Sequence, residues 1–264
     1  MGQVDFDLEE YLERIGYSGA IDPTAMVLEG LHRAQCYTIP FENFDIVMGR
    51  DISLAPDMLV KKLVRKPRGG YCFELNGLFY LALKAIGFDV QRILGRIHVT
   101  DTPTGRGHQL ALVTIDERQW IADVGFGHPG IRSPIPFKRE WETIHDNHTF
   151  RLMDAGRYGT MLQTLENHEW RNLFSFDLET VCDGDIEYGN YFNTTHPNSF
   201  FNSGRLAALP LKTGVVTLYN DMFTKAINKK EEVVLLKDTR TYLDVLKMSF
   251  GIEFETTDDL KIFL

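Results

Sequence analysis

Apolar positions in the first third of the chain recur with the period of a helix. Three stripes at helical spacing stand out: Leu8, Tyr11, Leu12 and Ile15; Val27, Leu28, Leu31 and Ala34; and Leu75, Leu78, Phe79, Ala82 and Ile86. Each stripe places its members on one helix face, as in helices that pack against a core. Gly87 supplies a stop after the third stripe. Helices are therefore predicted to dominate to about residue 88.

The period changes to two between about residue 89 and about residue 185. Short runs rich in β-branched and aromatic residues occur here, at 90–99, 109–115, 120–124, 149–153, 160–165 and 170–178. Turn residues separate these runs. Several short strands of this kind predict a small barrel or sandwich.

The last part of the chain mixes both patterns. It contains strand-like runs near 215–223 and 232–236, then a helical pattern from residue 238 or 239 to 250 that Gly251 ends. The sequence contains no internal repeat, low-complexity tract or obvious linker. We therefore predict an α+β protein in which helices come first, strands follow and the end is mixed.

The composition is that of an ordinary globular protein with a sizeable core, since 44% of the 264 residues are hydrophobic. The formal net charge is −9 and no long basic block offsets it, which argues against nucleic-acid binding. The N-terminus has neither a basic nor an apolar run, and no window reaches the roughly 18 apolar residues of a membrane span. A cytoplasmic location is expected.

The three cysteines, Cys36, Cys72 and Cys182, are a sparse set without Cys-x-x-Cys spacing. Such a set indicates neither a disulfide framework nor structural zinc, so free thiols are expected. His145 and His148 share a loop-like setting and have no apparent third ligand. No metal site is predicted.

Cys72 differs from the other two thiols in its setting. A diglycine at residues 69–70 leads into the third helical pattern and leaves Cys72 in its first turn. Unpaired N–H groups and the positive end of the helix dipole stabilise negative charge there, so a cysteine at such a position loses its proton more readily than a free one. Cys72 is a candidate nucleophile; the alternative interpretation is a small buried hydrophobe.

A predicted hairpin supplies partners for this sulfur. A two-residue turn at 116–117 sets a register in which His108 lies diagonal to Asp123 on one face of the sheet. Diagonal positions are roughly 7–8 Å apart at the backbone, and a hydrogen bond between imidazole and carboxylate can bridge that gap. Singly, His108 fits a structural histidine and Asp123 the start of a turn. Together with Cys72 they predict a Cys-His-Asp triad.

Four segments carry a resemblance to a known family. They are IPFENF at 39–44, RGGYCFELN at 68–76, WIADVGFG at 120–127 and TTHPNSFF at 194–201. With the order Cys, His, Asp, they resemble the arylamine N-acetyltransferase family over most of the chain. The resemblance implies a cysteine-protease-like core in three domains: a helical domain at 1–88 carrying the nucleophile, a β-barrel domain at 89–187 carrying the histidine and aspartate, and an α/β lid at 188–264.

The resemblance also implies ping-pong acetyl transfer. Cys72 takes an acetyl group from acetyl-CoA as a thioester, an arylamine, arylhydrazine or N-hydroxyarylamine then removes it, and His108 shuttles the protons. A thioester suits this chemistry because sulfur is nucleophilic near neutral pH and leaves well. Acetyl-CoA is then a substrate and no cofactor is bound. In keeping with the charge and the lack of an apolar span, no nucleic-acid or membrane partner is expected, and the expected assembly is a monomer or homodimer.

Further residues receive roles from the resemblance. The set expected around an aromatic acceptor is Phe41, Phe126 and Gly127, with Phe201 as a further wall. The set expected to contact the acyl donor is Thr104, Gly105 and Arg106. The expected structural ion pair beside the nucleophile loop is Glu42 with Arg68. Core packing is the alternative interpretation of the aromatic residues, and a simple turn is the alternative for the donor-side set.

Two other functions stay open on the residues alone. A transglutaminase-like or papain-like thiol hydrolase uses a triad in the same order, and it would accumulate no acetyl thioester on Cys72. An inactive ligand-binding scaffold is disfavoured because all three triad positions hold chemically competent residues.

Overall fold

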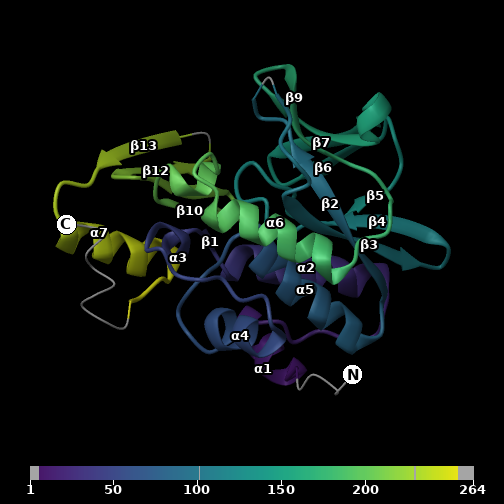
Figure 1. Cartoon of the computed structure of the whole chain (residues 1–264), viewed down its shortest axis with the longest axis horizontal. Coiled ribbons are helices and arrows are strands. Elements are labelled where there is room, and N and C mark those ends of the chain that lie inside the picture. The colour runs from purple at the N-terminus through teal and green to yellow at the C-terminus, as the bar shows by residue number, and fades with distance from the viewer. Residues whose placement is uncertain (1–5, 101, 229, 255–264) are drawn as a thin grey trace.

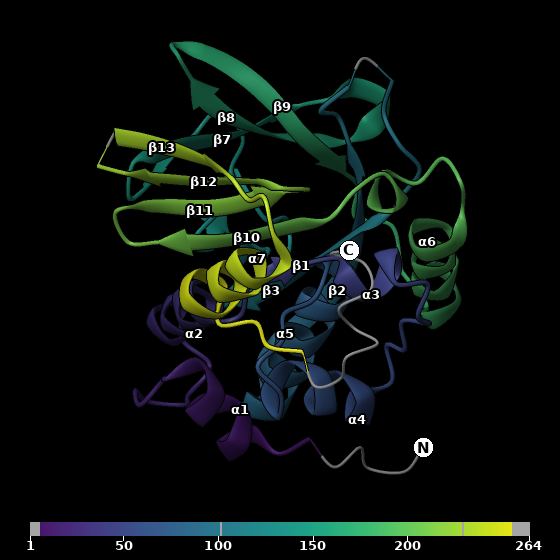
Figure 2. The same cartoon turned by 90° about the vertical axis from the view of Figure 1, so that its left-hand side faces the viewer.

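The computed structural model of the protein describes residues 6–100, 102–228 and 230–254. Helices fill the lower part of the view in Figure 1, a large twisted sheet lies above them, and a smaller sheet lies to the left. Figure 2 shows the smaller sheet stacked above the C-terminal helix. This mixed architecture confirms the predicted α+β class.

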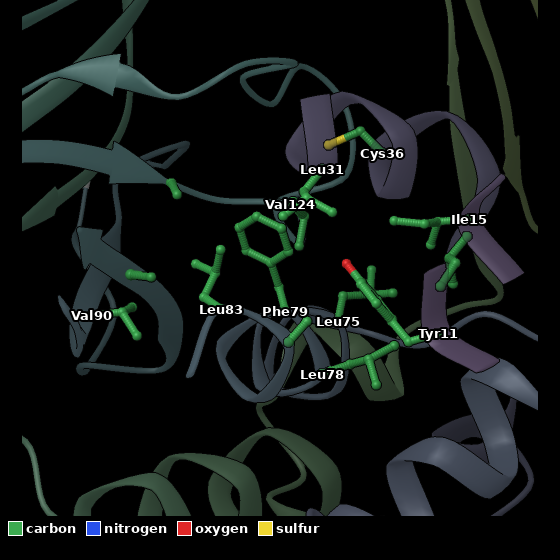
Figure 3. Packing of buried hydrophobic residues seen from close by; sticks show 14 of the residues in the cluster. Tyr11, Ile15, Leu31, Cys36, Leu75, Leu78, Phe79, Leu83, Val90 and Val124 are labelled. Atoms are coloured by element: carbon green, nitrogen blue, oxygen red, sulfur yellow. The ribbon is translucent and has the colours of Figure 1, made fainter. Parts of the chain in front are cut away.

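The helical part matches the three predicted apolar stripes. Its elements are α1 (Leu8–Ile15), α2 (Ala25–Thr38), α3 (Phe44–Val47), α4 (Pro56–Leu59) with the π-helical turn η1 (Val60–Val64), and α5 (Cys72–Ile86). Figure 3 shows the α5 side chains Leu75 and Phe79 packed among Tyr11 of α1 and Leu31 of α2. As predicted, Cys72 lies in the first turn of α5 and Gly87 caps its end, with a φ of 99°, the left-handed conformation that glycine adopts readily.

The second part is an eight-stranded antiparallel sheet that curls into a nearly closed barrel. Its strands are β2 (Asp89–Ile97), β3 (His108–Ile115), β4 (Arg118–Ala122), β5 (Ile135–Pro136), β6 (Glu142–His145), β7 (His148–Asp154), β8 (Thr160–Glu166) and β9 (Glu169–Phe176), in the order β5-β4-β3-β2-β9-β8-β7-β6. The predicted runs correspond to β2, β3, β4, β7, β8 and β9. Strands β5 and β6 were not predicted because they are only two and four residues long.

The hairpin of β3 and β4 has the predicted register. Ile115 pairs with Arg118, and Ala111 pairs with Ala122. The turn residues Asp116 and Glu117 have φ values of 47° and 64°, as a two-residue hairpin turn that follows the strand twist requires. The register therefore follows from local turn geometry.

The third part contains a five-stranded sheet in the order β1-β10-β11-β12-β13. Its strands are β1 (Phe41–Glu42), β10 (Leu206–Leu211), β11 (Gly214–Tyr219), β12 (Met222–Ile227) and β13 (Lys230–Leu235). The single run predicted at 215–223 was wrong, because a turn at Asn220, with φ of 51°, divides it into β11 and β12. Strand β1 belongs to the N-terminal part yet pairs with β10, Phe41 opposite Ala208.

The predicted C-terminal helix is present as α7 (Thr239–Val245), which continues into the π-helical turn η4 (Leu246–Phe250). Gly251 ends it with φ of 67°. Buried side chains of both elements pack on the smaller sheet, among them Tyr242 and Leu246. Among the described residues, no helix combines the length and apolarity needed to cross a bilayer.

Helix α6 (Asp183–Thr195) was missed by the sequence interpretation. Only Ile186 and Asn193 of this helix are buried, so it carries no apolar stripe. It lies over the start of α5, where Asn190 accepts a hydrogen bond from the Tyr71 hydroxyl (Figure 1). The predicted boundary between residues 187 and 188 falls inside this helix, and the three-domain division stays a prediction.

Candidate active site

The loop before Cys72 approaches the neighbouring backbone very closely. A Cβ at Gly69 would lie 2.0 Å from the carbonyl oxygen of Pro40, so only glycine fits there. The Gly70 N–H donates to that same oxygen at 3.2 Å, and the Glu42 N–H donates to the Gly70 carbonyl at 2.9 Å. The diglycine is thus held against β1, and it presents Cys72 at a fixed position in the first turn of α5.

The structure brings the three predicted triad side chains together in a buried site. His108 Nε2 lies 2.7 Å from Asp123 Oδ2, and the two residues are 2% and 1% exposed. The Cys72 Sγ lies 3.8 Å from the carbonyl oxygen of Gly107, the residue before His108, and the thiol is close enough to the His108 ring to act on its charge. Because Nε2 faces the carboxylate, Nδ1 is the nitrogen left to face the sulfur. The imidazole is therefore placed between thiol and carboxylate.

The electrostatics of the pair favour a charged imidazole. Burial opposes a charge on His108, but the Asp123 carboxylate, the hydrogen bond to it and the nearby Cys72 side chain outweigh burial and raise the pKa of His108 to about 10. Burial likewise opposes the charge of Asp123, yet His108, Asn76 and the Gly125 N–H together lower its pKa. The site can thus keep an imidazolium beside the sulfur at neutral pH.

Asn76 contacts Asp123, and the sequence interpretation missed it. Its Nδ2 donates to Asp123 Oδ1 at 2.9 Å, and its Oδ1 accepts from the Val124 N–H at 2.9 Å. Asn76 follows Cys72 by one helical turn, so its spacing of four residues was the available signal. At Gly125 a Cβ would lie 2.6 Å from Asn76 Nδ2 and 3.0 Å from Cys72 Cα, which explains the glycine.

Three of the predicted acceptor-side residues line one pocket next to the triad. Phe41, Phe126 and Gly127 lie on its wall together with Asp123. The Phe126 ring packs edge-on to the His108 ring, with centroids 5.4 Å apart. Phe201 is not among the lining residues, although its ring centroid lies 6.2 Å from that of Phe41.

The predicted donor-side residues form an exposed loop before His108. Thr104 is tied to β2 through its N–H, which donates to the Ile97 carbonyl at 3.1 Å. The Arg106 guanidinium lies 3.0 Å from Asp177 and 3.6 Å from Glu179. Its charge is thus shared with two carboxylates, and the contact of Thr104, Gly105 and Arg106 with an acyl donor stays a prediction.

Glu42 and Arg68 form a buried ion pair below the nucleophile loop. Arg68 Nη2 lies 2.7 Å from Glu42 Oε1 and 3.1 Å from Asp45 Oδ1. Lys62 joins the network at 2.7 Å from Asp45 and 2.8 Å from Glu74. The network links β1, α3, η1 and α5, so it connects the segments that carry the loop.

We expect Arg68→Met to lower the free energy of unfolding by about 3–5 kcal/mol, because it leaves Glu42 buried without the cation it pairs with and leaves Asp45 with Lys62 as its close buried cation. Arg65→Met is the matched control, since Arg65 pairs with Glu10 at 2.8 Å while its side chain is 55% exposed. That exposed pair should contribute less than about 1 kcal/mol. Urea unfolding measures both changes, and equal losses would refute a supporting role for the buried pair.

No group of three His, Cys, Asp or Glu side chains within the described ranges could hold a metal ion. His145 and His148 face each other across the β6–β7 hairpin. Cys36 is buried on α2, and Cys182 is exposed before α6.

Comparison with known proteins identifies the family. A family model described as N-acetyltransferase matches residues 24–259. The arylamine N-acetyltransferase / N-hydroxyarylamine O-acetyltransferase of Salmonella typhimurium is 36% identical over 93% of this chain and 88% of the relative. The arylamine N-acetyltransferase of Escherichia coli is 34% identical over 97% of this chain and 95% of the relative.

Solved structures agree with this match over most of the chain. Arylamine N-acetyltransferase from Salmonella typhimurium superposes with a TM-score of 0.91 at 34% identity, over 97% of this chain and 96% of the other. The Mycobacterium marinum enzyme in complex with CoA superposes with a TM-score of 0.88 at 34% identity, over 93% of each chain. The chain therefore belongs to the arylamine N-acetyltransferase family and is an acetyltransferase.

Proposed function

We propose that the protein transfers an acetyl group from acetyl-CoA to aromatic amines through a thioester on Cys72. The observation that carries the proposal is the buried imidazole of His108, held 2.7 Å from Asp123 Oδ2, with the Cys72 Sγ 3.8 Å from the carbonyl oxygen of the preceding residue, Gly107. The names of the relatives and the CoA complex of the Mycobacterium marinum protein support the choice of substrates.

The first half-reaction acetylates the enzyme. The Cys72 thiolate attacks the acetyl carbon of acetyl-CoA, the bond from that carbon to the CoA sulfur breaks, and the His108 imidazolium gives its proton to the departing CoA thiolate. Asp123 stabilises the charged imidazole before the transfer. Free CoA, acetyl-Cys72 and a neutral His108 remain.

The second half-reaction restores the enzyme. The acceptor nitrogen, or the hydroxyl oxygen of an N-hydroxyarylamine, attacks the thioester carbon. His108 takes the proton from the attacking atom, and Cys72 leaves as a thiolate. Arylamines, arylhydrazines and N-hydroxyarylamines are the proposed acceptors, bound between Phe41, Phe126 and Gly127 with Phe201 behind Phe41. Thr104, Gly105 and Arg106 are proposed to contact the acyl donor.

Steady-state kinetics with acetyl-CoA crossed against a panel of aromatic amines and hydrazines test the proposal. We expect parallel lines in double-reciprocal plots, because CoA leaves before the acceptor reacts. Intersecting lines would contradict the covalent intermediate, and absence of transfer to every acceptor would contradict the substrate class.

We expect iodoacetamide to alkylate Cys72 faster in the parent protein than in His108→Gln at neutral pH. The reason is that His108, with its pKa raised to about 10, is charged at this pH, and a positive charge beside the sulfur favours its nucleophilic form. In His108→Gln the rate at neutral pH should fall on the order of tenfold, and the pH profile of alkylation should change. Both proteins should carry Cys182→Ser, since Cys182 is an exposed free thiol. Superimposable pH profiles would contradict the assigned role of His108.

A further inference from the structure

The backbone N–H of Asp123 has an unusual acceptor. The β3–β4 ladder ends at the pair Ala111 and Ala122, so the Asp123 N–H lies just beyond it. This N–H donates instead to His32 Nε2 of α2, at 3.1 Å. His32 is 0% exposed and Asp123 is 1% exposed, so no solvent can replace this acceptor. A buried N–H without an acceptor is costly, and His32 satisfies this one.

The surroundings of His32 keep its acceptor nitrogen free of a proton. Burial and the neighbouring His145 lower the pKa of His32 to about 3, against a smaller opposing effect of Asp123. The neutral ring carries one proton, and because Nε2 accepts a hydrogen bond, that proton sits on Nδ1. Nδ1 lies 3.6 Å from Cys36 Sγ, and the ring packs edge-on to Phe79 with centroids 5.7 Å apart. The ring is thereby fixed in both position and tautomer.

We propose that His32 is a positioning residue that fixes Asp123 through its backbone. This inference rests on the proposed function, in which Asp123 stabilises the His108 imidazolium. Asn76 and the Gly125 N–H already hold Asp123 Oδ1, each at 2.9 Å. The Asp123 side chain is therefore oriented by α5 and by its own loop, while His32 of α2 holds the Asp123 main chain in place.

Loss of the acceptor at His32 changes this anchoring. The Asp123 peptide then rotates toward another acceptor, and the carboxylate leaves its position 2.7 Å from His108 Nε2. A weaker contact between carboxylate and imidazole leaves less imidazolium beside the Cys72 sulfur. The effect should therefore appear in the reactivity of Cys72, although His32 acts on it only through Asp123 and His108.

Three substitutions at His32 test the proposal, each combined with Cys182→Ser. A glutamine places its side-chain oxygen near the position of Nε2, whereas an asparagine reaches only as far as Nδ1 and a leucine offers no acceptor. At neutral pH we expect Cys72 alkylation and acetyl transfer to fall on the order of tenfold in His32→Leu and His32→Asn. His32→Gln should restore most of both rates.

Equal rates in His32→Leu and the parent, or equal losses in His32→Gln and His32→Asn, would overturn the proposal. Nitrogen NMR of the parent protein supplies a readout that does not depend on any variant: His32 should carry its proton on Nδ1, and a proton on Nε2 would overturn the assignment. If the alkylation rates follow the expected order while no acetyl transfer occurs, the proposed function fails and the positioning role stands.

Discussion

Cys72→Ser is expected to lose acetyl transfer by on the order of 10⁴-fold. The site is arranged for a charged imidazole near the sulfur, because the pKa of His108 is raised to about 10 by its partners. A serine hydroxyl holds its proton far more strongly, and a histidine that is already charged cannot accept that proton. Initial rates with acetyl-CoA and an aromatic amine measure the loss.

Cys182→Ser is the control for this substitution. Cys182 is exposed at the start of α6, where serine is a favourable capping residue, so the activity should stay unchanged. A Cys72→Ser protein that keeps a tenth or more of the wild-type rate would contradict a nucleophilic role for the sulfur.

Asp123→Asn should lower acetyl transfer by on the order of 10³-fold or more. Asparagine keeps the shape and can still accept from Asn76 and Gly125, so the substitution mainly removes charge. Burial then dominates at His108 and shifts its pKa downward, which leaves a neutral imidazole at neutral pH. Single-turnover acetylation of the enzyme reports the change directly.

Asp116→Asn serves as the matched control in the same hairpin. Asp116 is exposed in the turn with φ of 47°, a conformation that asparagine tolerates, and it lies far from the sulfur along the strand. The acetyl-transfer activity of the Asp116→Asn protein should equal that of the wild type. An Asp123→Asn protein as active as this control would show that the carboxylate does not act through His108.

The relation between His108 and Asp123 could be predicted from the sequence because it depends on local geometry. A two-residue turn fixes the strand register, and Ile115 does pair with Arg118 as expected. The position of α5 could be predicted for the same reason, since the period of its apolar residues and the glycine at its end, Gly87, are both features of the local sequence. These two local features bring the nucleophile and its partners within reach once the barrel packs on the helices.

Contacts between distant segments could not be predicted in this way. Asn76 and His32 reach Asp123 across 47 and 91 residues of sequence, and no spacing rule connects such positions. Strand β1 is only two residues long, and it forms a strand because it pairs with the distant strand β10, so its sequence alone could not predict it. Helix α6 exposes Tyr188 and Tyr191 at 81% and 69%, so its pattern is not that of a packed helix.

Peptide mass spectrometry after incubation with acetyl-CoA alone is the most direct test of the account. We expect one acetyl group on the peptide that contains Cys72, none on those of Cys36 and Cys182, and its release as acetylated amine when an aromatic amine is added. Two results would contradict the proposed thioester on Cys72: consumption of acetyl-CoA without an acetylated Cys72 peptide, or an acetyl group that added amine does not remove.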